Sequence, residues 1–86
     1  MQTPDRPDDM RALITQIARA LVDIPSEVQV QEESNSETTT LRLRVARSDV
    51  GKVIGKQGRT ARSLRTILGA VSMKHRHHYT LNIIEE

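Results

Sequence analysis

The sequence predicts a small α+β protein with the element order αββααβ. Apolar residues recur at helical spacing in two long segments, and they alternate with polar residues in three others. The chain has 86 residues, which is enough for one domain that buries only about 60% of the surface of its unfolded chain. Tyr79 is the only aromatic residue, so we expect one small aliphatic core and no deep enzyme cleft.

The first helix is expected to follow a loose tail formed by residues 1–7. Asp8 and Asp9 can cap a helix and place negative charge in its first turn. The apolar residues that follow have the spacing of one helical face: Met10, Leu13, Ile14, Ile17, Ala18 and Leu21. Pro25 is expected to end this helix, because the residue before a proline disfavours the helical conformation.

Two strands, residues 27–33 and 39–46, are expected to form a hairpin around the polar turn at residues 34–37. Val28 and Val30 alternate with polar residues in the first strand. In the second strand, one face carries Thr39, Leu41, Leu43 and Val45.

The second half of the chain predicts two helices and a third strand. A short helix would begin with a cap at Ser48 or Asp49 and stop at Gly55. A longer helix over residues 59–73 would turn four apolar residues inward: Ala61, Leu64, Leu68 and Val71. A basic connection at residues 74–78 leads to a strand over residues 79–84, with Tyr79, Leu81 and Ile83 on one face.

Charge is unevenly distributed along the chain. Residues 1–40 carry eight acidic and three basic side chains, whereas residues 41–79 carry ten basic side chains and a single acidic one, Asp49. Such a basic segment is typical of a surface that binds a polyanion, although scattered basic residues are more often simply solvated.

The stretch Gly55-Lys56-Gln57-Gly58 lies between the two predicted helices. Its glycines tolerate a positive φ, and they have no side chain to hold a ligand away from the backbone. The next helix adds free N–H groups and the positive end of its dipole. The stretch therefore predicts a site for a phosphodiester, with Lys56 and Arg59 adding charge. The alternative is an ordinary corner between two helices.

The segment VIGKQGRTA resembles the V-I-G-x-x-G signature of KH domains. The longer stretch SDVGKVIGKQGRTARSLRTIL, within the order αββααβ, resembles the small bacterial single-domain KH proteins of the KhpA family, and the likeness covers residues 9–85. This resemblance implies a type II KH domain over residues 8–86, with helices on one face of a three-stranded sheet. It also implies binding of single-stranded RNA, with four nucleotides in a groove and their backbone clamped by the G-x-x-G turn.

The resemblance assigns roles to particular residues. Gly55, Lys56, Gln57 and Gly58 would form the clamp, and Val53 and Ile54 would help to form the apolar wall of the groove. Three further basic residues are expected to contact RNA: Lys52, Arg59 and Arg62. Ala61 departs from the general KH pattern, which has a larger aliphatic residue there.

Catalysis and metal binding are not expected. The spacing of Gly51, Gly55 and Lys56 does not match a phosphate-binding P-loop, and no pair of carboxylates is placed for acid and base chemistry. His75, His77 and His78 have no carboxylate nearby in the sequence and fit a basic surface better than a metal site. No cofactor is expected.

The expected location is the cytoplasm. The chain has no cysteine, and its longest apolar run is far short of the roughly 20 residues that a membrane span needs.

A protein interface is the competing hypothesis. The second long helix carries an apolar stripe of Leu64, Ile67, Leu68 and Val71. If Ile67 is exposed it marks a contact between helices, and otherwise it completes the core. The resemblance implies self-association and pairing with a larger KH protein, KhpB (also called Jag or EloR), in the control of cell elongation and division. The expected protein is thus a dimeric, non-catalytic RNA chaperone or post-transcriptional regulator, or alternatively an interaction module in which RNA binding is secondary.

Overall fold

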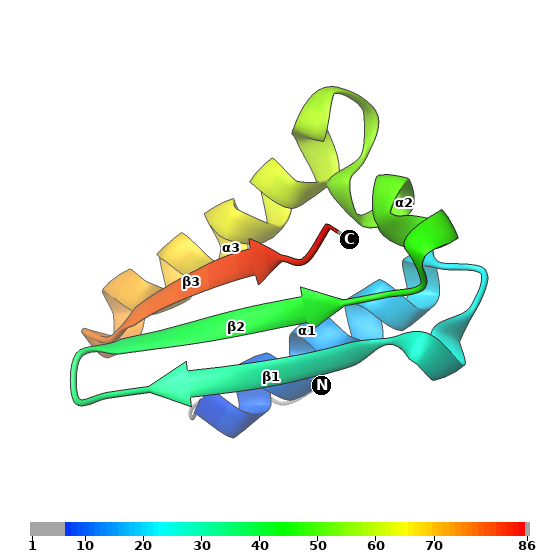
Figure 1. The fold of residues 1–86 in the computed structure, drawn as a ribbon. Helices are drawn as coiled ribbons and strands as arrows, with labels where there is room; N and C mark the ends of the chain where they lie inside the picture. Colours follow the sequence, from blue (N-terminus) through cyan, green and yellow to red (C-terminus); the bar gives the residue numbers. More distant parts are fainter. Residues whose placement is uncertain (1–6, 86) are drawn as a thin grey trace.

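The computed structural model describes residues 7–85, and it confirms the predicted α+β class and the order αββααβ (Figure 1). Its elements are α1 (Pro7–Leu21), β1 (Gln29–Ser34), β2 (Thr38–Arg44), α2 (Val50–Ile54), α3 (Arg59–His75) and β3 (His78–Ile83). Three short 3₁₀ turns join them: Pro25–Glu27, Arg47–Asp49 and Lys56–Gly58. Most of the predicted tail lies outside the described residues, and Pro7 is the first residue of α1.

The three strands form a mixed sheet in the order β1-β2-β3. β1 runs antiparallel to β2, with Val30 opposite Leu43, and β3 runs parallel to β2, with Leu81 opposite Leu41. The parallel pairing is possible because α2 and α3 return the chain to the start of β2. Figure 1 shows α1 and α3 on the same side of the sheet.

The core lies between the sheet and these two helices. Alternate residues of β2 and β3 are buried, as predicted: Thr39, Leu41, Leu43, Tyr79, Leu81 and Ile83. Met10, Ile14 and Ala18 of α1, together with Val22 just after it, pack against them. Leu21, which was expected to face inward, is the last residue of α1 and stays 38% exposed, while Val22 is buried.

Pro25 does not end α1, which stops four residues earlier at Leu21. The N–H groups of Asp23 and Ile24 instead donate to the two carboxylate oxygens of Asp49, at 3.2 and 3.0 Å. Asp49 stands at the N-cap position of α2, as one of the two predicted alternatives, but it is 1% exposed and its side chain makes no cap bond to that helix. Ser48 supplies no cap bond either. The end of α1 is thus fixed by hydrogen bonds from the N–H groups just after it to a distant carboxylate, and not by the proline that follows in the sequence.

Further boundaries shift by a few residues. α3 continues to His75, because Arg76 closes the helix in the left-handed conformation with φ 54°. Residues 74 and 75 of the predicted connection are therefore helical, residues 76 and 77 form the turn, and β3 begins at His78. β1 starts at Gln29, after the turn Pro25–Glu27. Within residues 7–85, no helix combines the length and the apolar character that a membrane crossing requires.

Candidate nucleic-acid interface

The GKQG turn, residues 55–58, joins α2 to α3 and projects beyond the sheet (Figure 1). Gly55 and Gly58 both have positive φ angles, 79° and 74°, and Gln57 between them also adopts a left-handed conformation with φ 57°. The N–H of Gly58 donates to the carbonyl of Gly55 at 3.1 Å. The chain thus makes the tight turn that the sequence predicted.

The two glycines are required for different reasons. At Gly55, ψ is 170°, and a Cβ would lie 2.7 Å from Cβ of Thr60 and 2.8 Å from its backbone nitrogen. At Gly58 a Cβ would meet no atom within 4 Å, so only the left-handed backbone disfavours a side chain. The missing side chain at Gly55 thus makes room for Thr60, and the one at Gly58 leaves the backbone of the turn open to close approach.

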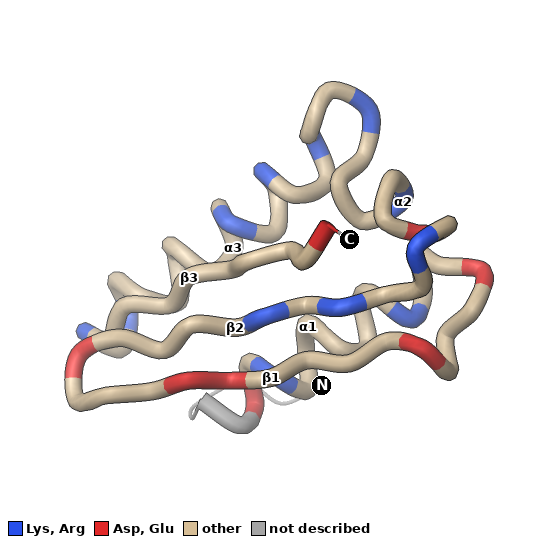
Figure 2. Tube along the Cα trace, in the orientation of Figure 1, with Lys and Arg blue, Asp and Glu red and all other residues tan. Residues whose placement is uncertain are grey.

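Positive charge surrounds the turn. Lys56, Arg59 and Arg62 are exposed, and the first turn of α3 contains no acidic residue. The Arg59 guanidinium donates to Oε1 of Gln57 at 3.2 Å, so this cation is held beside the turn. Figure 2 shows basic residues along the turn and along α3, whereas acidic residues gather on β1 and its connections. The positive end of the α3 dipole adds to this field.

Lys52 is less available than the sequence suggested. Its ammonium lies 3.2 Å from a carboxylate oxygen of Asp23 and 3.3 Å from one of Asp49, and hydrogen bonds to these two groups raise the pKa of Lys52. Burial alone would raise the pKa of Asp49, but the N–H groups of Asp23 and Ile24 and the Lys52 ammonium together lower it. Lys52 therefore stabilises the junction of α1 and α2 rather than standing free beside the turn.

One of the two residues predicted for the groove wall lies in the core instead. Val53 is 0% exposed and belongs to the core, so it cannot present a surface to a ligand, whereas Ile54 is half-buried. A helix of five residues turns only part of its circumference outward, and Val53 is on the core side. Ala61 is also buried, at 3% exposure, so its small size affects the packing of α3.

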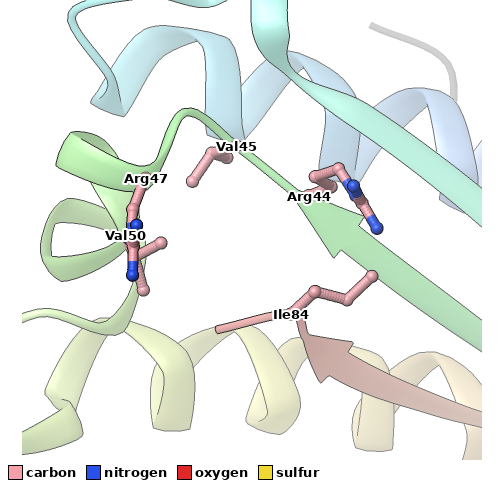
Figure 3. A pocket seen from close by; sticks show the side chains of 5 residues that line it. All are labelled: Arg44, Val45, Arg47, Val50 and Ile84. Carbon is pink, nitrogen blue, oxygen red and sulfur yellow. The ribbon is translucent and has the colours of Figure 1, made fainter. Parts of the chain in front are cut away.

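A hollow of about 200 Å³ lies between the start of α2 and the ends of β2 and β3 (Figure 3). It is lined by Arg44, Val45, Arg47, Val50 and Ile84. Arg47 and Val50 face it from one side, and Arg44 and Ile84 from the strand ends. None of these five residues was predicted as part of the site, because the fold brings together residues 40 positions apart. The one signal in the sequence is that Val50 and Ile54 are four residues apart, which places both on one side of α2.

Comparison with known proteins agrees with this architecture. The family model described as KhpA/KhpB, KH domain, matches residues 11–83. The chain belongs to the KhpA/KhpB KH-domain family. Proteins named RNA-binding protein KhpA are similar to it: that of Treponema pallidum is 53% identical over 73 residues, covering 85% of this chain and 91% of the relative. That of Clostridium acetobutylicum is 45% identical over 75 residues, covering 87% of this chain and 100% of the relative.

The histidines of this KH domain lie far from the GKQG turn, where α3 ends and β3 begins. Nε2 of His77 lies 2.7 Å from the hydroxyl of Thr39, which is itself 2.8 Å from the hydroxyl of Ser34. Thr39 is fully buried, and the ring of His77 packs against Tyr79 with centroids 5.0 Å apart. His77 thus contributes to the interior of the fold rather than to a free basic surface.

The apolar stripe of α3 divides between core and surface. Leu64 and Leu68 are 4% and 0% exposed and pack in the core, so the prediction that they form a protein interface was wrong for this fold. Val71 is half-buried against the core. Ile67 is 43% exposed, which excludes the alternative that it completes the core of the monomer.

Proposed function

We propose that this chain is a non-catalytic protein that binds single-stranded RNA and holds the RNA backbone at the GKQG turn. The observation that carries the proposal is the turn itself: two glycines with positive φ at the start of α3, beside exposed Lys56 and Arg59. The relatives named RNA-binding protein KhpA support RNA as the polyanion.

The backbone of the turn supplies the first contact in this proposal. A phosphate can approach the turn closely at Gly58, where no side chain covers the backbone, and the N-terminus of α3 favours negative charge. Lys56, which is exposed, provides one cation, and Arg59, oriented by Gln57, provides a second. These contacts position the strand but read no sequence.

The hollow beside α2 supplies the second contact. Val50 and Ile84 offer apolar surface to an unpaired base, and Arg44 and Arg47 add charge at its rim. A duplex keeps its bases stacked and paired, so it cannot place one there. We therefore expect single-stranded RNA to bind more tightly than duplex RNA, with a modest preference among bases.

The double variant Lys56→Asp/Gln57→Asp tests the clamp. It places two negative charges at the turn, and Asp tolerates the left-handed conformation at position 57. The control is Arg19→Asp/Gln16→Asp, which makes the same change in net charge at exposed positions of α1. Filter binding to a mixed-sequence single strand should show a large loss for the turn variant and little for the control. Unchanged affinity in a turn variant that circular dichroism shows to be folded would refute the clamp.

Salt dependence gives a second measurement. Three or four phosphate contacts to a single strand should give a slope of about −2 to −3 in log affinity against log salt, at roughly −0.7 per contact. Equal affinity for duplex and single strand would contradict binding of unpaired bases in the hollow and leave only general charge attraction.

Pairing through α3 is a second candidate function, favoured by the exposure of Ile67. A homodimer would present two turns to one strand, and avidity would increase without new contacts. The family resemblance adds a larger KH protein of the KhpB, Jag or EloR type as a partner, and a cytoplasmic role as an RNA chaperone or post-transcriptional regulator in cell elongation and division. In the interaction-module alternative, this pairing is the main function and RNA binding is secondary.

A further inference from the structure

The ladder between β1 and β2 ends at the pair Gln29 and Arg44. Beyond this pair the two segments separate, and a 3₁₀ turn at residues 25–27 precedes β1 while another at residues 47–49 follows β2 (Figure 1). A second hollow, of about 360 Å³, lies between the two segments. Sites for small ligands have volumes of roughly 300–1,000 Å³, so this space is large enough for one nucleobase.

The lining of this hollow is polar, and its two sides differ in charge. Ser26, Glu27 and Gln29 contribute a hydroxyl, a carboxylate and an amide from the side of β1. Arg44 and Arg47, which are both exposed, contribute guanidinium groups from the side of β2. Hydrogen-bonding groups opposite two cations fit a ligand that combines a polar ring with a negative charge, as a nucleotide does.

The polar groups on the β1 side are available to a ligand. Within residues 7–85, the side chains of Ser26, Glu27 and Gln29 form no hydrogen bond or ion pair. Glu33, on the same strand, differs, because its carboxylate pairs with Arg42 at 3.0 Å. Since the three side chains at the hollow are exposed, they bind water, which a ligand can replace without breaking a contact of the fold.

This hollow adjoins the hollow beside α2. The two share Arg44, Val45 and Arg47, whereas Glu27 and Gln29 line only the second. A strand that places one base in the first hollow can therefore bring its next phosphate to the two arginines and its next base into the second hollow. This continuity favours a further nucleotide of the same strand over a separate ligand.

We propose that the hollow beyond the β1–β2 ladder is a base-reading subsite for the nucleotide next to the one held beside α2. The proposal rests on the proposed function and deepens it, because it gives the bound strand a base preference. The Glu27 carboxylate only accepts hydrogen bonds, so it favours a base with an exocyclic amino group. Cytosine offers its N4 amino group, and Gln29 can complete the contact, whereas uracil presents a carbonyl oxygen there, which the carboxylate repels.

Cytidine and uridine homopolymers of about ten nucleotides test this preference, because the two bases have similar size and differ in the groups that Glu27 would face. In fluorescence anisotropy we expect the natural chain to bind the cytidine strand about fivefold more tightly. Glu27→Gln should reduce this ratio to about one, since an amide can accept from cytosine or donate to uracil. Glu37→Gln is the matched control. It removes the same charge in the turn between β1 and β2, and it should leave the ratio unchanged.

Gln29→Val gives an independent measurement that changes no charge. Valine suits a strand, so the variant should fold. Loss of the amide should weaken binding of the cytidine strand about threefold and leave the uridine strand nearly unchanged. Gln31→Val is the control, because Gln31 lies two residues further along the same face of β1 and lines neither of the two hollows.

Equal affinity of the natural chain for the two strands would overturn the proposal, and so would a ratio that Glu27→Gln leaves unchanged. Equal losses for Gln29→Val and Gln31→Val would also overturn it, because the effect would then belong to β1 as a whole. A loss of self-association in sedimentation with RNA binding unchanged would make this surface a contact between copies of the chain instead. Failure of the proposed function is seen separately, as binding of the uridine strand that Lys56→Asp/Gln57→Asp does not weaken.

Discussion

Replacing Gly55 by alanine should destabilise the fold far more than the same change at Gly58. The φ and ψ angles of Gly55, 79° and 170°, lie in a region that only glycine adopts readily, and a side chain there costs about 1–3 kcal/mol. The new Cβ would also lie 2.8 Å from the backbone nitrogen of Thr60, so the first turn of α3 must shift. Such overpacking costs about 1–3 kcal/mol more. We therefore expect Gly55→Ala to lose about 3 kcal/mol or more.

Gly58→Ala is the matched comparison for this prediction. Gly58 has φ 74° and ψ 14°, the ordinary left-handed conformation, and a Cβ there meets nothing within 4 Å. Its cost should be only the left-handed penalty of about 1–2 kcal/mol. Urea denaturation followed by circular dichroism measures both free energies of unfolding. If Gly55→Ala were no more destabilising than Gly58→Ala, the contact with Thr60 would not constrain the turn as argued here.

Three further predictions concern residues away from the turn. Ile67→Asp should stay folded, because the side chain is 43% exposed. If α3 forms the dimer contact, the mass of the variant in sedimentation equilibrium should be half that of the natural chain. A natural chain that is already monomeric would contradict the homodimer. Asp49→Asn should lower the urea midpoint at neutral pH. The pKa of Asp49 is lowered from 3.8 in the folded chain, so ionised Asp49 stabilises the fold above pH 3.8 and this stabilisation is lost as the pH falls below it. The difference in urea midpoint between the variant and the natural chain should therefore become smaller in acid. Thr39→Val should cost about 1–2 kcal/mol in thermal or urea melts, because His77 and Ser34 lose their buried partner, and a neutral result would argue against this network.

Local patterns in the sequence were sufficient for the elements and for the turn. The alternation of Leu41 and Leu43 with arginines predicts a strand with one buried face, and the two glycines around Lys56 and Gln57 predict a tight turn. These features depend on residues a few positions apart. The family resemblance supplied the arrangement of the elements in space.

Contacts between distant segments could not be predicted in this way. Asp49 looked like a local helix cap, but its carboxylate oxygens accept hydrogen bonds from backbone N–H groups 25 and 26 residues earlier in the chain. Lys52 looked free because one of its partners, Asp23, is also far away in the sequence and the other, Asp49, looked like a helix cap. Val53 precedes the turn directly, yet which side of so short a helix faces the core depends on where α1 and α3 pack.

The parallel pairing of β2 with β3 also determines when the turn acquires its shape during folding. Thr38 pairs with His78, so this ladder closes only after a crossover of about 40 residues, whereas the β1–β2 hairpin closes locally. α2, with five residues, is too short to persist as an isolated helix. The conformation of Gly55 and Gly58 therefore depends on α2 and α3 being docked on the completed sheet. In a chain emerging from the ribosome the hairpin can form early, but the GKQG turn can take its final conformation only once β3 has been synthesised and paired.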